Sequence, residues 1–322
     1  MKTTGSEKKT IIRHSFITRI ALLIISAIIL AASSDCFAAA VSDQLSFDLN
    51  LPPSMLGQGS SEIFRAFQEL RTVFRNDMDI DLSIQVTDSW NEVINRLETD
   101  KTDFAWMPPY YYFRARANNP KSKIRPLAIY QSKGTTASPT CIYVKPNGIR
   151  KLEDLLATRV AFPDEAGWAV LNHIFIHDPV MAANQIDPSR FFVKFRILPR
   201  ESSALAIRFN AVDAIVLEPL YMEYLPPKDQ DKNKIMKLVC SEPLANTVIV
   251  YRKNLDPFMK ETLELFLTSM HSDPTFSQFR HFFKTTNGQW TSANEKALVS
   301  WKKIYTESVK NGWDKSYKAL PK

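Results

Sequence analysis

The sequence of 322 residues contains few glycines and few cysteines for its length. Its 8 glycines, against 19 prolines, leave few stretches that could form a phosphate-binding loop. Three cysteines are too few for a fold held together by disulfides. Only one apolar run is long enough to suggest a membrane span, which excludes a multi-span membrane protein. Because 45% of the residues are hydrophobic and 11% aromatic, the chain is not intrinsically disordered, and its length suggests two domains.

The amino terminus has the three parts of a secretory signal peptide. Basic residues precede an apolar run from Ile20 to Ala32, and the small residues Ala38–Ala40 follow. This pattern predicts cleavage after Ala40 or after Ala38, so we assign residues 1–40 to a signal peptide. The alternative is an uncleaved signal that anchors the chain, because about 20 apolar residues span a bilayer.

Removal of the signal peptide changes the interpretation of charge and cysteines. Residues 1–40 carry five basic and two acidic side chains, so the net charge falls from 41 − 34 = +7 to 36 − 32 = +4. The remainder has no Lys/Arg run interleaved with aromatics, and we expect no nucleic-acid binding. Cys141 and Cys240 would meet an oxidising compartment, where they either pair or stay as two buried thiols.

Hydrophobic periodicity predicts alternating strands and helices in the first hundred residues of the mature chain. Apolar residues at helical spacing indicate helices over about 61–74 and 89–97. Between and beside them lie three predicted strands, at 45–51, 79–86 and 103–107. The order strand, helix, strand, helix, strand is typical of a parallel α/β architecture.

The rest of the mature chain continues this alternation and ends in helices. The predicted strands are 140–145, 159–162, 191–197, 213–217, 238–240 and 247–252. Helices are predicted between them at 152–156, 167–177 and 202–209. Asp256-Pro257 and Asp273-Pro274 each place a capping residue before a proline, which favours helix starts in the tail.

Several segments occur in an order and spacing known from one family. They are Val86–Val93, Leu97–Asp103 with Met107–Tyr110, Gly148–Leu155 with Arg159–Phe162, and Phe209–Ile215, in which Asn210 replaces a usual glycine. With these segments the chain resembles a type 2 periplasmic substrate-binding protein of ABC transporters, of the phosphate/phosphonate-binding type. The resemblance covers roughly residues 45–312.

The resemblance implies an α/β fold of two lobes, each a sheet flanked by helices, joined by two crossover strands. The apolar runs Thr140–Lys145 and Thr247–Arg252 would be the crossovers. Lobe one would comprise residues 41–139 plus 246–322, and lobe two residues 140–245. The lobes would close around a ligand held in the cleft between them.

The implied function is that of a periplasmic solute-binding protein, and we predict neither catalysis nor a cofactor. We expect a monomer that captures a small polar ligand and delivers it to an ABC transporter permease. The alternative partner is a membrane sensor that detects the ligand-bound, closed protein.

Eight residues are candidates for ligand contact, because they lie in loops after strands or at helix amino termini. They are Trp90, Ser89, Tyr110, Glu165, Trp168, Arg200, Ser202 and Glu218. Each aromatic side chain could stack on ligand or anchor its own helix. Arg200 could pair with a ligand carboxylate or be a solvated surface charge, and Glu218 could bind an amine.

The loop that opens the lobe-two helix departs from the family pattern. In phosphonate binders hydroxyl residues hold the oxyanion here, but the segment Pro163–Trp168 contains no Ser or Thr. Asp164 and Glu165 place negative charge there instead, which opposes anion binding. The resemblance implies a phosphonate-like ligand, whereas these residues suit an amine-bearing one, and we expect a neutral, zwitterionic or cationic ligand to fit them better. Trp168 could stack on a cation.

A zinc-dependent enzyme is the remaining alternative. His173 and His177 lie four residues apart on one helical face, a spacing that can hold zinc. No third ligand is evident, and the glutamate of the H-E-x-x-H pattern is missing. We therefore interpret them as two surface histidines and predict no metal site. The chain also lacks a Gly-x-Ser-x-Gly motif.

Overall fold

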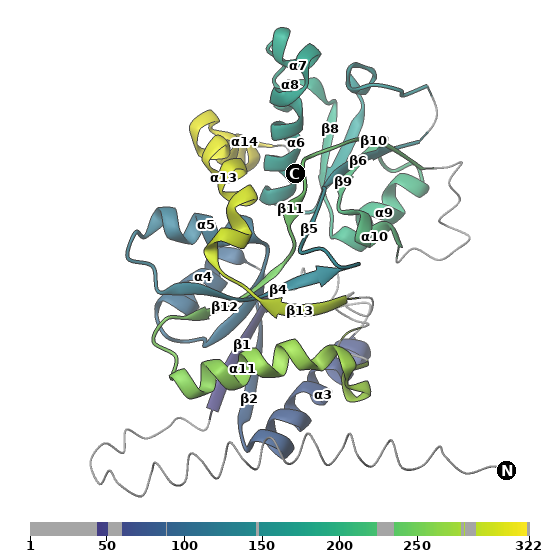
Figure 1. The fold of residues 1–322 in the computed structure, drawn as a ribbon. Helices are drawn as coiled ribbons and strands as arrows, with labels where there is room; N and C mark the ends of the chain where they lie inside the picture. The colour runs from purple at the N-terminus through teal and green to yellow at the C-terminus, as the bar shows by residue number, and fades with distance from the viewer. Residues whose placement is uncertain are drawn as a thin grey trace, which may run out of the picture. The chain divides into compact units, whose positions relative to one another are not determined.

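The computed structural model describes residues 44–50, 60–87, 89–145, 148–223, 235–277, 280 and 288–320. The predicted signal peptide lies outside these residues. All described elements belong to one unit, Asp43–Lys322. Within it the described strands form two large sheets flanked by helices and one two-stranded sheet, in agreement with the predicted α/β class (Figure 1).

The first sheet has six strands in the order β13-β4-β12-β3-β1-β2. Three of them pair in parallel, namely β1 (Gln44–Asn50), β2 (Asp81–Thr87) and β3 (Phe104–Met107). The other three run antiparallel to their neighbours, namely β12 (Val248–Arg252), β4 (Ile124–Ser132) and β13 (Gly288–Ser292). The parallel part contains the strand-helix-strand alternation that the sequence predicts.

Helices cover both faces of this sheet. They are α3 (Ser60–Met78), α4 (Trp90–Glu98), α5 (Pro109–Asn118) and α11 (Pro257–Ser269), followed by the short turns η3 (Met270–Ser272) and η4 (Pro274–Phe276). Side chains of β3 alternate between two cores: Phe104 packs with residues of α3 and α11, and Met107 with residues of α4 and α5. This alternation follows from the two-residue period of a strand.

The second sheet has five strands in the order β10-β6-β9-β7-β8. Its strands are β10 (Met236–Cys240), β6 (Cys141–Val144), β9 (Ala214–Leu217), β7 (Arg159–Phe162) and β8 (Lys194–Ile197). Strand β7 pairs in parallel with β8 and β9, whereas β6 runs antiparallel to β9 and β10. Around this sheet lie η1 (Leu152–Leu155), α6 (Glu165–His177), α7 (Pro179–Ala183), α8 (Pro188–Phe191), α9 (Arg200–Arg208) and α10 (Pro219–Glu223).

A two-stranded ladder connects the sheets. It pairs β5 (Ala137–Ser138) with β11 (Leu244–Ala245) in antiparallel register. The predicted positions of the crossovers were therefore wrong by a few residues. Thr140–Lys145 contributes β6 to the second sheet, and Thr247–Arg252 contributes β12 to the first. Both runs are apolar because central strands are buried on both faces.

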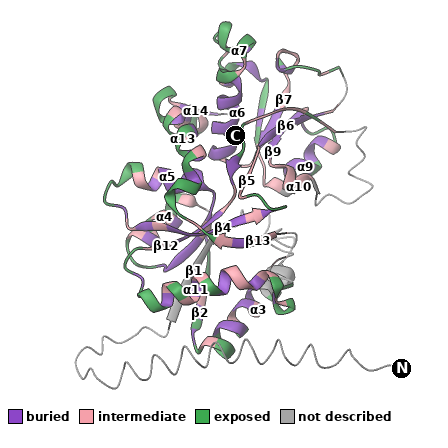
Figure 2. Ribbon diagram, in the orientation of Figure 1, coloured by how far each residue is buried: buried purple, intermediate pink, exposed green. Residues whose placement is uncertain are grey.

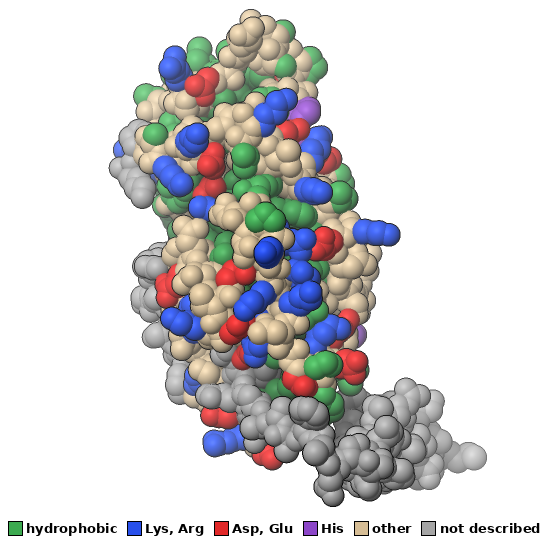
Figure 3. All heavy atoms as spheres, turned by 90° about the vertical axis from the view of Figure 1, so that its left-hand side faces the viewer, with side chains coloured by type: hydrophobic (Ala, Val, Ile, Leu, Met, Phe, Trp, Pro, Cys, Tyr) green, Lys and Arg blue, Asp and Glu red, His purple; other side chains and the backbone are tan. Residues whose placement is uncertain are grey.

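The carboxyl-terminal helices pack against helices that flank each sheet. After η5 (Glu295–Leu298) come α13 (Val299–Asn311) and α14 (Trp313–Ala319). Helix α13 contacts α5 and α6, and α14 contacts α6. Charged side chains of both signs are interspersed on the face that these helices form (Figure 3).

Helix α6 is buried along most of its length (Figure 2). Residues from Glu165 to Phe175 are buried on every side, because the second sheet covers one face and α13 and α14 cover another. A largely apolar helix is expected in such a position, and the buried stretch of α6 contains only three polar side chains, Glu165, Asn172 and His173. Asp164 caps it, since its carboxylate accepts a hydrogen bond from the Gly167 amide at 3.0 Å.

Of the two states left open for the cysteines, the structure has the disulfide. Cys141 in β6 and Cys240 in β10 are register partners in the antiparallel ladder, and their Cα atoms are 4.0 Å apart. The bond therefore links two neighbouring strands that are 99 residues apart in sequence.

Asn210 adopts a backbone conformation that explains the glycine usually found there. Its φ is 59°, in the left-handed region where glycine is favoured and asparagine is tolerated. The Asn210 side chain accepts a hydrogen bond from the Lys145 ammonium group, which also donates to the Arg208 carbonyl at 2.9 Å.

Candidate functional site

A small cavity lies where the crossover ladder meets elements of both sheets. Its volume is about 50 Å³. Pro108, Tyr130 and Ser132 line it from the side of the first sheet, and Ser138 and Leu244 from the crossovers. The second sheet contributes side chains from loops and helices that follow its strands, namely Arg200, Glu218, Leu220 and Tyr221.

Arg200 and Glu218 meet in the wall of this cavity, as expected from their places after β8 and β9. The Arg200 Nη2 and Glu218 Oε1 atoms are 3.3 Å apart, and Arg200 Nε lies 3.4 Å from both carboxylate oxygens. On its other side, Arg200 Nη1 lies 3.8 Å from Asp164 Oδ2. The guanidinium carbon is 5.5 Å from the centroid of the Tyr221 ring, within the range of a cation–π contact.

These three charged groups carry one positive and two negative charges when all are ionised. Burial raises the pKa of Asp164, and the charge of Arg200 opposes this rise. Burial disfavours the charged guanidinium of Arg200, but Glu218 and Asp164 outweigh it, so the pKa of Arg200 lies well above its usual value. When all three are ionised, the group therefore carries a net negative charge. Its single cation, Arg200, is already paired with the two carboxylates.

Glu165 and Tyr110 lie in a buried network between α5 and α6. The Tyr110 hydroxyl donates to Glu165 Oε1 at 3.1 Å and lies 3.1 Å from the Ser308 hydroxyl of α13. Arg114 Nη1 donates to Glu165 Oε2 at 2.7 Å. Burial raises the pKa of Glu165, and Arg114 opposes this rise. In this structure Tyr110 and Arg114 both contact Glu165, and Tyr110 is fully buried.

The two candidate tryptophans lie in packed surroundings. Trp168 is 1% exposed, and its indole N–H donates to the Trp313 carbonyl and the Ser316 hydroxyl of α14, both at 3.1 Å. Trp90 stacks on Tyr111 with 4.9 Å between ring centroids. Each aromatic therefore anchors its helix in this state.

The two serine candidates lie at helix starts. Ser89 is the N-cap residue of α4, but its side chain makes no capping hydrogen bond. Ser202 is half-buried in the first turn of α9. The described residues that line the cavity include neither serine. Ligand contact by these two, as by the other six candidates, stays a prediction.

Sequence reasoning missed Arg114 and the cavity residues from the crossovers. Arg114 lies in the middle of α5, where no rule based on strand ends or helix starts would select it. Asn246 follows the crossover strand β11 and donates from its side chain to the Tyr130 carbonyl at 3.0 Å. The signal that could have indicated Asn246 is its place beside a crossover strand. The sequence placed that crossover a few residues further along the chain, at Thr247–Arg252.

A wider surface hollow of about 490 Å³ lies at the opposite end of the second sheet. Lys145, Asp154, Thr158 and Asp213 are among its lining residues. Thr158 and Asp213 directly precede β7 and β9, so the hollow is at the amino ends of parallel strands. Ligands of open α/β sheets bind at the carboxyl ends, which favours the smaller cavity as the candidate site.

The two histidines of α6 do not match their predicted setting. His173 is 1% exposed, so the prediction of two surface histidines was wrong for this residue. Its ring nitrogens contact Glu307 of α13 and Glu242, which precedes β11. The side chain of His177 is 49% exposed and also contacts Glu307. The sequence could not indicate these partners, because they are 134 and 69 residues from His173.

Comparison with solved structures places this fold among periplasmic binding proteins. A binding protein component of an ABC phosphonate transporter from Pseudomonas aeruginosa matches with a TM-score of 0.64 at 16% identity, over 84% of this chain and 87% of that chain. PhnD1 from Prochlorococcus marinus, in complex with methylphosphonate, matches with a TM-score of 0.64 at 12% identity, over 84% and 99%. The aliphatic sulphonate binding protein SsuA from Escherichia coli gives 0.56 at 10% identity, over 87% and 89%. At these identities the likeness shows a shared fold.

Comparison of the sequence with curated proteins finds no match. Among the residues that the structure describes, no helix has both the length and the apolar character needed to cross a membrane. A family model described as "ABC transporter, phosphonate, periplasmic substrate-binding protein" matches residues 55–295, most of the chain. The chain therefore belongs to the family of phosphonate-type periplasmic substrate-binding proteins of ABC transporters.

Proposed function

We propose that this protein binds one small polar ligand between its two lobes and, as a monomer, delivers it to an ABC importer. The observation that supports this proposal is the meeting of Arg200 and Glu218 in the wall of a cavity lined from both sheets and both crossovers. Convergent polar groups in a cavity between lobes are typical of small-molecule sites. Lobe one would comprise residues 41–139 plus 246–322, and lobe two residues 140–245.

The charges in the wall favour a ligand that carries an amine. Arg200 already faces Glu218 and Asp164, so a purely anionic ligand would have to displace these carboxylates and overcome their repulsion. A ligand with both an amine and an acidic group could place the amine on Glu218 and the acidic group on Arg200. We therefore expect a zwitterionic or cationic ligand rather than a simple phosphonate.

Ligand entry requires the lobes to separate. The cavity of about 50 Å³ is far smaller than the roughly 300–1,000 Å³ of typical ligand sites. The β5–β11 ladder is the connection about which the lobes would open. In the open state, the buried candidates Tyr110 and Glu165 would also become accessible, since they lie where α5 meets α6.

A matched pair of ligands tests the amine requirement. Calorimetry on the mature protein would compare 2-aminoethylphosphonate with ethylphosphonate, which differ only in the amine. A panel of phosphate, amines and amino acids, read as thermal shifts, would identify other ligands. Glu218→Gln should weaken binding of amine-bearing ligands about tenfold or more, because it removes a charge-assisted hydrogen bond. Glu264→Gln, which alters a surface pair with Lys260 on α11, is the matched control.

Two results would contradict the proposal in different ways. Tighter binding of ethylphosphonate than of its amino analogue would refute the ligand chemistry but leave the binding role intact. No response to any member of the panel would argue against the binding role itself. Delivery is tested separately, by stimulation of the ATPase activity of the reconstituted transporter.

A further inference from the structure

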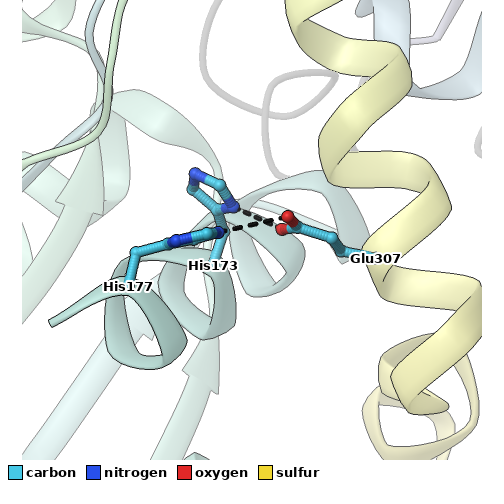
Figure 4. Close-up of side chains that lie close together, drawn as sticks. All are labelled: His173, His177 and Glu307. Carbon is cyan, nitrogen blue, oxygen red and sulfur yellow. Dashed lines mark hydrogen bonds and ion pairs between the residues drawn. The ribbon is translucent and has the colours of Figure 1, made fainter. Parts of the chain in front are cut away.

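Three potential metal ligands meet between α6 and α13. His173 and His177 project from the same face of α6 toward Glu307 on α13 (Figure 4). Each of the three residues offers one ligand atom, and these atoms all lie within 4.8 Å of one another. The four-residue spacing of the histidines produces this arrangement, because residues i and i+4 lie one above the other on a helix.

The atoms that approach one another most closely are ring nitrogens and carboxylate oxygens, which are the atoms that ligate metal ions. His173 Nδ1 lies 2.5 Å from Glu307 Oε2, and His177 Nε2 lies 3.1 Å from Glu307 Oε1. In a tetrahedral zinc site, bonds of about 2.0–2.2 Å place ligand atoms roughly 3.3–3.6 Å apart. Binding would therefore require the three ligand atoms to move slightly apart, and the His177 side chain, which is 49% exposed, has room to rotate.

Glu242 orients the buried histidine from the other side of its ring. Its Oε2 atom lies 2.8 Å from His173 Nε2, and its Oε1 atom lies 3.2 Å from the Lys303 ammonium group. When the ring donates its Nε2 proton to Glu242, the lone pair of Nδ1 points toward His177 and Glu307. A carboxylate behind a ligating histidine is a usual feature of zinc sites, because it fixes the ring and its tautomer.

We propose that His173, His177 and Glu307 form a binding site for one zinc ion, with Glu242 as the residue that positions His173. Two imidazoles and one carboxylate suit zinc, whereas magnesium prefers oxygen ligands alone. A water molecule would complete four-fold coordination. The site is distinct from the cavity beside Arg200, whose lining includes none of the three ligands.

Bound zinc would join α6, which flanks the second sheet, to α13. Helix α13 also reaches α5 beside the first sheet, since Ser308, the residue after Glu307, contacts the Tyr110 hydroxyl at 3.1 Å. Zinc would therefore stabilise the packing of one helix against elements of both sheets. The expected consequence is a rise in thermal stability on zinc binding.

Calorimetry on tag-free, chelator-treated mature protein tests the site. The wild type should bind one equivalent of Zn²⁺, raise its Tm with zinc, and show no response to Mg²⁺. His177→Ala should weaken zinc binding about 100-fold or more, and Glu242→Gln about 10- to 100-fold. His177 is the safest ligand to remove because its side chain is half exposed. His271→Ala, which alters a histidine on η3, is the matched control and should bind as the wild type does.

Either of two outcomes would overturn the proposal. One is the absence of stoichiometric zinc binding by the wild type. The other is equal zinc affinity in the wild type, His177→Ala and Glu307→Gln. Circular dichroism of each variant shows whether it is folded, and an unfolded Glu307→Gln would leave His177→Ala as the deciding variant.

Discussion

Arg114 on α5 and Glu165 at the start of α6 form an ion pair, with 2.7 Å between Nη1 and Oε2. Their side chains are 15% and 7% exposed, so the pair is largely removed from water. The Tyr110 hydroxyl donates to the same carboxylate. Because α5 flanks the first sheet and α6 the second, this contact connects elements of both sheets.

Arg114→Ala should lower the free energy of unfolding by about 3–5 kcal/mol near neutral pH, because it leaves a buried carboxylate without its cation. Burial raises the pKa of Glu165, and loss of Arg114 removes the charge that opposes this rise. The folded variant therefore binds a proton more readily than its unfolded chain. The free energy of unfolding of the variant should therefore increase as the pH falls from 7 toward about 4.3, the pKa of glutamate in an unfolded chain. The difference in stability between the variant and the wild type should become smaller over this range. Urea unfolding at pH 7 and pH 5 measures both effects.

A double-mutant cycle supplies the control for this prediction. In a Glu165→Gln background no charge is left uncompensated, so Arg114→Ala should cost about 1 kcal/mol or less. Equal costs in the two backgrounds would show that Arg114 acts through packing alone.

Asp213→Asn should lower stability at neutral pH by about 1 kcal/mol. Arg159 donates to both carboxylate oxygens of Asp213 from its side chain, at 2.9 and 2.7 Å, and again from its backbone amide at 2.9 Å. These hydrogen bonds hold the pKa of Asp213 below its usual value. Its contribution is present above the unfolded pKa of about 3.9 and is lost as the pH falls through the folded value.

The wild type and Asp213→Asn should therefore differ in urea midpoint at pH 7 and converge as the pH falls below the lowered pKa of folded Asp213. The pair lies before β7 and β9, away from the cavity beside Arg200, so ligand affinity should not change. A difference that persists at low pH would mean that the charge of Asp213 is not the cause.

The sequence predicted the elements better than the contacts between them. The strands and helices follow from local periodicity, and Arg200 and Glu218 could be selected because each follows a strand of the second sheet. Trp168 could not be placed, because its hydrogen-bond partners are 145 and 148 residues away on α14. His173 was misplaced for the same reason. Sequence spacing shows which side chains share a helical face, but not which distant helix covers that face.

The disulfide between Cys141 and Cys240 should contribute about 2–4 kcal/mol to stability. It closes a loop of 99 residues, and a cross-link over a long loop restricts the unfolded chain strongly. It also ties β10 to β6 at the edge of the second sheet, where β6 is the one neighbour of β10 among the strands that the structure describes. A reductant such as dithiothreitol should therefore lower the urea midpoint of the wild type. Cys141→Ala/Cys240→Ala should have the lower midpoint without reductant and no further response to it. An equal fall in urea midpoint in both proteins would mean that the reductant acts elsewhere. An unchanged midpoint in the wild type would mean that this bond does not constrain the unfolded chain.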